Sequence, residues 1–131
     1  MTRFGDIIKF IDFFKFCESK EVGECCGLNG NFGWSYSEKV HEFIYALRKI
    51  NFRFNKYEIL KNDKIDFWKV DFDNEDITKY SAKALVSLLQ VADDFERVCD
   101  GLFHVFWEKG WLVKILEILK TRDYEYIGFQ K

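Results

Sequence analysis

The sequence predicts a mainly α-helical protein, folded as a single compact domain of five or six helices that could also hold one small β-hairpin or short sheet. Three observations predict this class. Apolar residues recur at the helical spacing i, i+3, i+4, i+7 in several segments. The chain has no proline, so only glycines and polar turns can interrupt its helices. Its 131 residues suit one helical domain, 1–131, and 48% of them are hydrophobic, which is enough for a dense core.

The first predicted helix runs from Asp6 to Cys17. A polar residue stands at every third place, and the positions between are isoleucine or phenylalanine, with cysteine at position 17. Such a wide apolar surface must be covered on more than one side. We therefore expect a central helix, or one that lends a face to a partner.

A glycine-rich segment comes next, at residues 21–37, and its composition predicts a loop that could contain a short hairpin. Loops of this length are unusual in a compact domain and are often functional. Ser37 then predicts the start of a helix over "SEKVHEFIYALRKI". Its expected buried stripe is Val40, Phe43, Ile44, Leu47 and Ile50.

Residues 51–76 carry a weaker pattern. "NKYEILK" predicts one or two helical turns, and "KIDFWKVDFDNED" fits either a strand or a short helix and a loop. Acidic residues concentrate at the end of this segment, where we expect a solvated connection. They are Asp71, Asp73, Glu75 and Asp76.

The C-terminal half has the clearest helical pattern. A helix from about Ser81 should turn one apolar stripe inward, and beyond it Gly101 and Gly110 mark off two more helices, over Leu102–Glu108 and Trp111–Arg122. The tail, residues 123–131, is β-prone and could pair locally. The expected inward residues are Ala84, Leu85, Leu88, Leu89, Ala92 and Phe95, then Leu112, Ile115, Leu116 and Leu119.

The charge balance excludes some classes of function. Lysine and arginine total 20 against 22 acidic residues, so the basic excess of a typical nucleic-acid-binding protein is missing and direct nucleic-acid binding is not expected. The charges within residues 6–17 do not suit a signal peptide, and no apolar run is long enough to span a membrane. We therefore expect a cytoplasmic protein without a membrane partner, whose cysteines are reduced.

The cysteines and histidines could form a structural zinc site, because their number suits four ligands. The adjacent pair at 25–26 would chelate one ion awkwardly, however, and cysteine is among the most buried residue types. Core packing is the interpretation we favour, so no cofactor is expected; zinc is the alternative, and a disulfide is a third interpretation. The candidate ligands are Cys17, Cys25, Cys26 and Cys99, with His41 and His104 in reserve.

A charged group surrounds the helix break at Gly101. Arg97 lies between Glu96 and Asp100, so we expect an ion pair that fixes the junction between two helices, with Gly110 at the next junction. The alternative is an anion-binding site. A catalytic cysteine–histidine pair is not expected, because residues 99 and 104 lie about 140° apart around a helix.

A set of residues in the second half of the chain carries a resemblance. It consists of Leu88, Leu89, Glu96, Arg97, Cys99, Asp100, Gly101, Trp107, Glu108, Gly110, Leu112, Ile115 and Leu116. Through these residues the chain resembles, over roughly residues 37–122, domain of unknown function family 6508, a bacterial family. Asp94 and Val98 stand where that family has an arginine and a phenylalanine. No activity is established for the family, so the resemblance implies a fold and not a function.

Two groups of residues lie outside the helical periodicity. Phe32, Trp34 and Tyr36 alternate as on a strand and could cap the core, stack on bases or anchor a protein partner. The acidic run 71–76 could mimic a phosphate backbone for a basic partner surface.

The function we expect is that of a small cytoplasmic protein-binding module. It could inhibit a host or rival protein, as phage-borne anti-defence proteins such as anti-CRISPR proteins and immunity-type proteins do, and a homo-oligomer stays open. The alternative is an enzyme or small-ligand-binding protein with a site around Arg97, Asp100 and His104. Because the sequence has no glycine-rich phosphate loop, zincin helix or nucleophile elbow, we favour the binding module.

Overall fold

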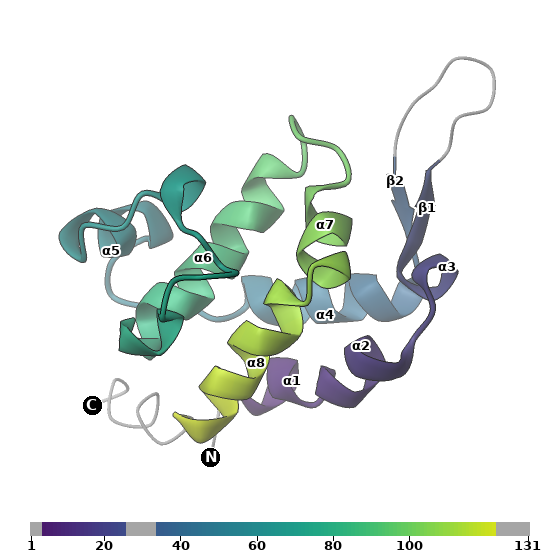
Figure 1. The fold of residues 1–131 in the computed structure, drawn as a ribbon, viewed down its shortest axis with the longest axis horizontal. Coiled ribbons are helices and arrows are strands. Elements are labelled where there is room, and N and C mark those ends of the chain that lie inside the picture. The colour runs from purple at the N-terminus through teal and green to yellow at the C-terminus, as the bar shows by residue number, and fades with distance from the viewer. Residues whose placement is uncertain (1–3, 26–33, 123–131) are drawn as a thin grey trace.

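The computed structural model of the protein describes residues 4–25 and 34–122. Within these residues the chain forms eight α-helices, two 3-10 helices and one pair of short strands around a single hydrophobic core (Figure 1). The predicted mainly helical class is therefore confirmed. The elements are α1 (Gly5–Ile8), α2 (Ile11–Phe16), α3 (Ser19–Val22), β1 (Gly23–Cys25), β2 (Trp34–Tyr36), α4 (Glu38–Arg48), α5 (Lys56–Asn62), η2 (Phe67–Lys69), η3 (Ile77–Lys79), α6 (Ala82–Phe95), α7 (Leu102–Glu108) and α8 (Trp111–Thr121).

The first predicted helix is divided in two. α1 and α2 are separated by a tight turn in which the N–H of Phe10 donates to the carbonyl of Ile7 at 3.2 Å. The turn lets α1 pack against α4 and α8 while α2 packs along α8. Neither glycine nor proline stands at the break, so the sequence does not show it. Phe16, at the end of α2, is 78% exposed.

The central helix is α6, and the expectation that the first helix takes this place is wrong. α6 packs against α4, α5, α7 and α8 (Figure 1). Most of its residues are buried. Ser81 begins it by accepting a hydrogen bond from the N–H of Ala84 at 3.1 Å, which satisfies one of the free N–H groups of the first turn. Because several of the buried residues of α6 are alanine or serine, the four neighbouring helices can pack close to its backbone. The buried residues of α6 are Ala82, Ala84, Leu85, Val86, Ser87, Leu88, Leu89, Val91 and Ala92.

The strand pairing expected in segment 21–37 and the helix after it are both confirmed, while residues 26–33, between the two strands, lie outside the described residues. β1 and β2 pair antiparallel, with Gly23 opposite Tyr36. A Cβ atom at Gly23 would lie 2.8 Å from the Tyr36 ring, so the pairing needs a residue without a side chain there. Ser37 then caps α4, and all five expected stripe residues of that helix are buried.

Residues 51–76 form helical turns, so the strand alternative is wrong. Asn55 begins α5 by accepting from the N–H of Glu58 at 2.9 Å. Asp66 accepts from the N–H of Trp68 at 3.1 Å, and this local bond starts the 3-10 helix η2 where a strand would need the N–H for its ladder. Phe67 is buried by that turn.

Aromatic rings divide the core into two clusters. In the first, Phe14 and Phe43 meet edge to face at a centroid distance of 5.1 Å, and Phe103 packs against both. In the second, Phe106 contacts Phe72 at 5.2 Å and Trp111 at 5.3 Å. Because Phe103 and Phe106 both belong to α7, this short helix joins the two clusters.

Glycines begin both of the last two helices, as the sequence predicts. Gly101 precedes α7 with φ of 90°, and Gly110 precedes α8 with φ of 80°. Both angles lie in the left-handed region that glycine adopts without strain.

We expect Gly101→Val to lower the free energy of unfolding by about 1–3 kcal/mol, because a β-branched residue is strained at a positive φ. Gly101→Asn is the matched control, since asparagine tolerates this backbone conformation. Thermal unfolding should give a clearly lower Tm for the valine variant than for the asparagine variant. A Tm of Gly101→Val equal to that of the wild type would contradict this role of Gly101.

Candidate functional site

The Glu96 carboxylate is the centre of the junction between α6 and α7. Its Oε1 accepts from the Tyr36 hydroxyl at 2.6 Å and from the N–H of Phe103 at 2.8 Å, and its Oε2 accepts from the N–H of Gly101 at 2.6 Å. One side chain therefore satisfies free N–H groups at the start of α7 and fastens β2 to the same place.

The environment of this carboxylate shifts the pKa of both partners. Burial raises the pKa of Glu96 above its ordinary value; hydrogen bonds from Tyr36, Phe103 and Gly101 oppose the rise, and the side chain of Asp100 adds to it. Burial, together with the hydrogen bond and the charge of Glu96, raises the pKa of Tyr36 far above its ordinary value. Tyr36 therefore remains a neutral hydrogen-bond donor.

Arg97 does not form the expected ion pair at this junction, so that prediction is wrong. Its side chain is exposed and pairs with neither Glu96 nor Asp100. The α6 carboxylates upstream bind other cations: Asp93 takes a two-pronged hydrogen bond from Arg48, at 2.7 and 3.0 Å, and Asp94 lies 3.0 Å from the Lys56 ammonium. The junction depends on Glu96 and Gly101, and the arginine points to solvent.

A second polar cluster lies beside the junction and contains His104, Ser19 and Glu108. His104 is only 6% exposed. Its Nε2 lies 2.9 Å from the Ser19 hydroxyl, and its Nδ1 lies 3.5 Å from a carboxylate oxygen of Glu108. We expected no nucleophile–base pair at His104, and Ser19 was not among our candidates. The two residues are 85 positions apart, so no local spacing could connect them.

The candidate zinc ligands do not come together in the described part of the chain. Cys17 is half-buried, which raises its pKa, and Cys99 is exposed. His41 is exposed beside the Tyr45 ring. The side chain of Cys25 and the whole of Cys26 lie outside the described residues. Among residues 4–25 and 34–122, no three histidine, cysteine or acidic side chains are grouped to hold a metal, and zinc stays a prediction.

The aromatic residues proposed for partner binding do not share one environment. Phe32 and the side chain of Trp34 lie outside the described residues. Tyr36 is half-buried, bonded to Glu96, and packs edge to face on Phe103 at 5.6 Å. Its ring is therefore part of the first aromatic cluster, and its role toward a partner stays a prediction.

The acidic run has structural bonds of its own. Asp71 accepts from the N–H groups of Asp73 and Asn74, each at 3.1 Å, and Asp73 accepts from the indole N–H of Trp111 at 2.8 Å. Asp76 begins η3 by accepting from the N–H of Thr78. Hydrogen bonds from these neighbours lower the pKa of Asp71 and of Asp76. The run is solvent-facing, as expected, and it also fixes the loop that seats Phe72 in the core.

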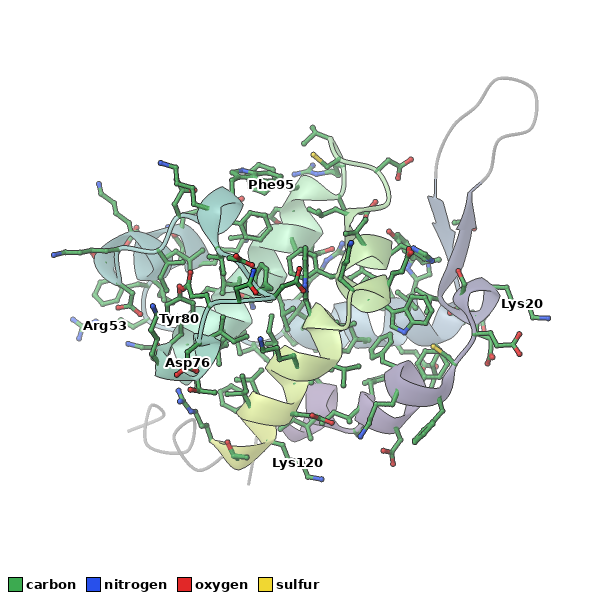
Figure 2. The ribbon with its side chains drawn as sticks, viewed as in Figure 1. Lys20, Arg53, Asp76, Tyr80, Phe95 and Lys120 are labelled. Atoms are coloured by element: carbon green, nitrogen blue, oxygen red, sulfur yellow. The ribbon has the colours of Figure 1, made fainter. Side chains whose placement is uncertain are left out.

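A groove between α5, η2 and the end of α6 was not anticipated from the sequence. We call it the α5–α6 groove; its volume is about 350 Å³. Two of the residues that line it are half-exposed, Trp68 at 56% and Tyr57 at 48%, while Leu60 and Phe67 in the same lining are buried. Figure 2 shows Phe95 at the end of α6, at the edge of the molecule. The lining residues are Tyr57, Leu60, Lys61, Ile65, Asp66, Phe67, Trp68, Val91 and Phe95.

A larger hollow of about 550 Å³ lies where α4 ends and α5 begins. Its lining is mainly polar and includes Arg48, Arg53 and Lys56. Two of these cations are paired with Asp93 and Asp94, so most of the charge in this hollow is already matched. It offers less to a ligand than the apolar α5–α6 groove does.

Comparison of the chain with protein-family models, with curated proteins and with solved structures gave no match. The resemblance to domain of unknown function family 6508 therefore stays a prediction. No helix in the described part of the chain is both long enough and apolar enough to cross a membrane.

We expect Glu96→Ala to lower the free energy of unfolding by about 2 kcal/mol, because it leaves the Tyr36 hydroxyl and two backbone N–H groups without their acceptor. Glu96→Gln keeps one acceptor oxygen and should lose less. Urea unfolding of the three proteins near neutral pH measures this order. Equal stability of the alanine variant and the wild type would contradict the central position of Glu96.

The raised pKa of Glu96 predicts a pH effect. The folded protein keeps a proton on this carboxyl to higher pH than the unfolded chain does, so the associated stabilisation is full below the ordinary pKa of 4.5 and is lost as pH rises through the folded-state pKa. The stability of the wild type relative to Glu96→Gln should therefore be greater at about pH 4 than at about pH 7. Urea unfolding of both proteins at each pH tests this, and a difference independent of pH would refute it.

Proposed function

We propose that the protein is a protein-binding module whose α5–α6 groove receives a bulky apolar side chain of a partner. The observation that carries the proposal is a pair of half-exposed aromatic rings, Trp68 and Tyr57, that line an apolar depression. Tryptophan and tyrosine dominate the binding energy of protein interfaces when they surround a pocket. An apolar hollow with few polar groups suits a side chain better than a charged metabolite.

The rings of the groove are held in position before any partner arrives. Trp68 contacts Phe67 and Phe95, each at a centroid distance of 4.9 Å. Its backbone N–H is bonded to Asp66, and the Tyr57 hydroxyl donates to Asp94 at 2.8 Å. A partner would therefore lose little affinity to the ordering of these side chains.

Charge complementarity defines the partner further. Lys61 lines the groove and makes no ion pair with any described residue, whereas Asp66 bonds to Trp68 and lies 4.0 Å from Lys69. Arg97 is exposed and close enough to affect the electrostatics of Tyr57. The unmatched charge near the groove is thus positive. The fitting occupant is a protein segment with a leucine, phenylalanine or tryptophan side chain flanked by aspartate or glutamate.

This surface differs from the two we expected from the sequence, Phe32–Trp34–Tyr36 and the acidic run. It is favoured because Tyr36 and Asp73 are already bonded within the fold. A protein that acts by covering a partner's surface fits an inhibitor, such as a phage-borne anti-defence or immunity-type protein, working in the cytoplasm. The enzyme alternative has one observation in its favour, the histidine at 104 bonded to a serine.

Selection from a random-peptide phage library tests the groove without a known partner. The wild type is the target, and Trp68→Ala is used for counter-selection. We expect the enriched peptides to carry a large apolar residue beside an acidic one and to bind Trp68→Ala at least about tenfold more weakly, since an anchoring tryptophan contributes about 2 kcal/mol. Titration of the synthetic peptides by calorimetry gives the affinities.

Two further variants sharpen the test. Tyr45→Ala removes a ring of similar exposure from α4, outside the groove, and should bind as the wild type does. Lys61→Glu should weaken binding of the acidic peptides. Peptides that bind Trp68→Ala as tightly as the wild type would overturn the proposal. So would a wild-type dimer that Trp68→Ala abolishes in size-exclusion chromatography, because the occupant would then be a second copy.

A further inference from the structure

We propose that Ser19 is a nucleophile for acyl transfer, with His104 as its general base and Glu108 as the residue that orients the base. The inference goes beyond protein binding and concerns a different face of the molecule. The Ser19 hydroxyl oxygen and His104 Nε2 are 2.9 Å apart, which is hydrogen-bond distance for proton transfer. Glu108 Oε2 lies 3.5 Å from Nδ1 on the opposite side of the ring. A serine, a histidine and a carboxylate in this order form the arrangement that activates serine nucleophiles.

The position of the carboxylate favours one tautomer of the imidazole. A negative charge 3.5 Å from Nδ1 favours the proton on that nitrogen, and in this tautomer the lone pair on Nε2 accepts the proton of Ser19. Glu108 stands one helical turn after His104 on α7, so the pairing is built into the helix. The role of Glu108 is one of positioning, because it does not touch the nucleophile.

The base is held rigidly from several sides. His104 is buried, and its ring packs against Trp107 at a centroid distance of 5.3 Å. The Trp107 indole N–H donates to the carbonyl of Phe14 at 2.8 Å, which fixes it to α2. Glu96 fixes the start of α7. A base whose ring is fixed by packing needs little reorganisation when the proton moves.

The nucleophile, in contrast, is open to solvent. Ser19 is exposed at the first position of α3, and the neighbouring Lys20 projects away from the molecule in Figure 2. If the only role of Ser19 were to form a hydrogen bond with the buried His104 imidazole, its hydroxyl would react no faster than that of any other exposed serine. Enhanced reactivity is therefore the property that separates a nucleophile from a structural hydrogen bond.

The reaction balances with an ester and water. The Ser19 oxygen attacks the ester carbonyl carbon while its proton passes to His104 Nε2; the bond from that carbon to the leaving oxygen breaks, and the leaving alcohol takes the proton. Water then attacks the acyl-serine ester, His104 accepts its proton and returns it to the departing Ser19 oxygen. The products are a carboxylic acid and an alcohol. Small carboxylic esters with good leaving groups are the fitting substrate class for so exposed a serine.

The test uses the full chain and two probes, p-nitrophenyl acetate and an alkyl fluorophosphonate, with intact-mass spectrometry and peptide mapping. We expect one adduct on Ser19 of the wild type and none at that position in Ser19→Ala. His104→Gln should slow adduct formation by about 100-fold or more, the usual contribution of a general base. Ser35→Ala is the matched control, because Ser35 is an exposed serine on β2 with no histidine partner among the described residues, and it should react as the wild type does.

Circular dichroism should show that Ser19→Ala stays folded, since an exposed side chain is removed. Glu108→Gln should slow the reaction less than His104→Gln does. The proposal is overturned if folded wild type gives no adduct with either probe, or if adducts form at the same rate in Ser19→Ala. It is also overturned if Ser35 reacts as fast as Ser19. None of these outcomes depends on the α5–α6 groove, so the two proposals fail independently.

Discussion

The Glu96 carboxylate is the constraint on which the arrangement of the second half of the protein depends. α6 is central and must end where α7 begins, in a turn whose backbone N–H groups have no partner within the helix. Glu96 supplies that partner and takes a third hydrogen bond from Tyr36. One side chain therefore sets the direction of α7 and the position of the β1–β2 pair. A half-buried carboxyl group achieves this because its two oxygens accept three hydrogen bonds at one place.

The direction of α7 has consequences for both halves of the core. Its two phenylalanines enter different aromatic clusters, one with α2 and α4, the other with the 67–72 segment and α8. The same helix carries His104, which contacts Ser19 through Nε2, and Glu108, which lies near Nδ1 of the same ring. α7, a helix of seven residues, therefore contributes to both aromatic clusters of the core and to the cluster of Ser19, His104 and Glu108.

The sequence revealed those features whose cause is local. Ser37 and Ser81 mark helix starts because a serine hydroxyl satisfies an N–H two or three residues on, and Gly101 and Gly110 mark helix breaks because their backbone is left-handed. The division of the first helix had no such marker. The ion pair predicted for Arg97 was wrong because acidic residues that are close in sequence need not lie close to its guanidinium. The contact of His104 with Ser19 could not be predicted because the two residues are 85 positions apart. The α5–α6 groove is lined by residues of α5, of the 3-10 helix η2 and of α6. The segment that forms α5 and η2 has no clear hydrophobic periodicity, so its sequence did not predict the groove.

The exposure of Trp68 also gives the α5–α6 groove a natural fluorophore. The indole N–H of Trp107 donates to the Phe14 carbonyl and that of Trp111 donates to Asp73, and both rings are partly covered, whereas Trp68 has more than half of its surface in water. Indole emission responds to the polarity around the ring, so covering Trp68 changes its emission while the rings of the core keep theirs. Occupancy of the groove can therefore be followed in the unlabelled protein.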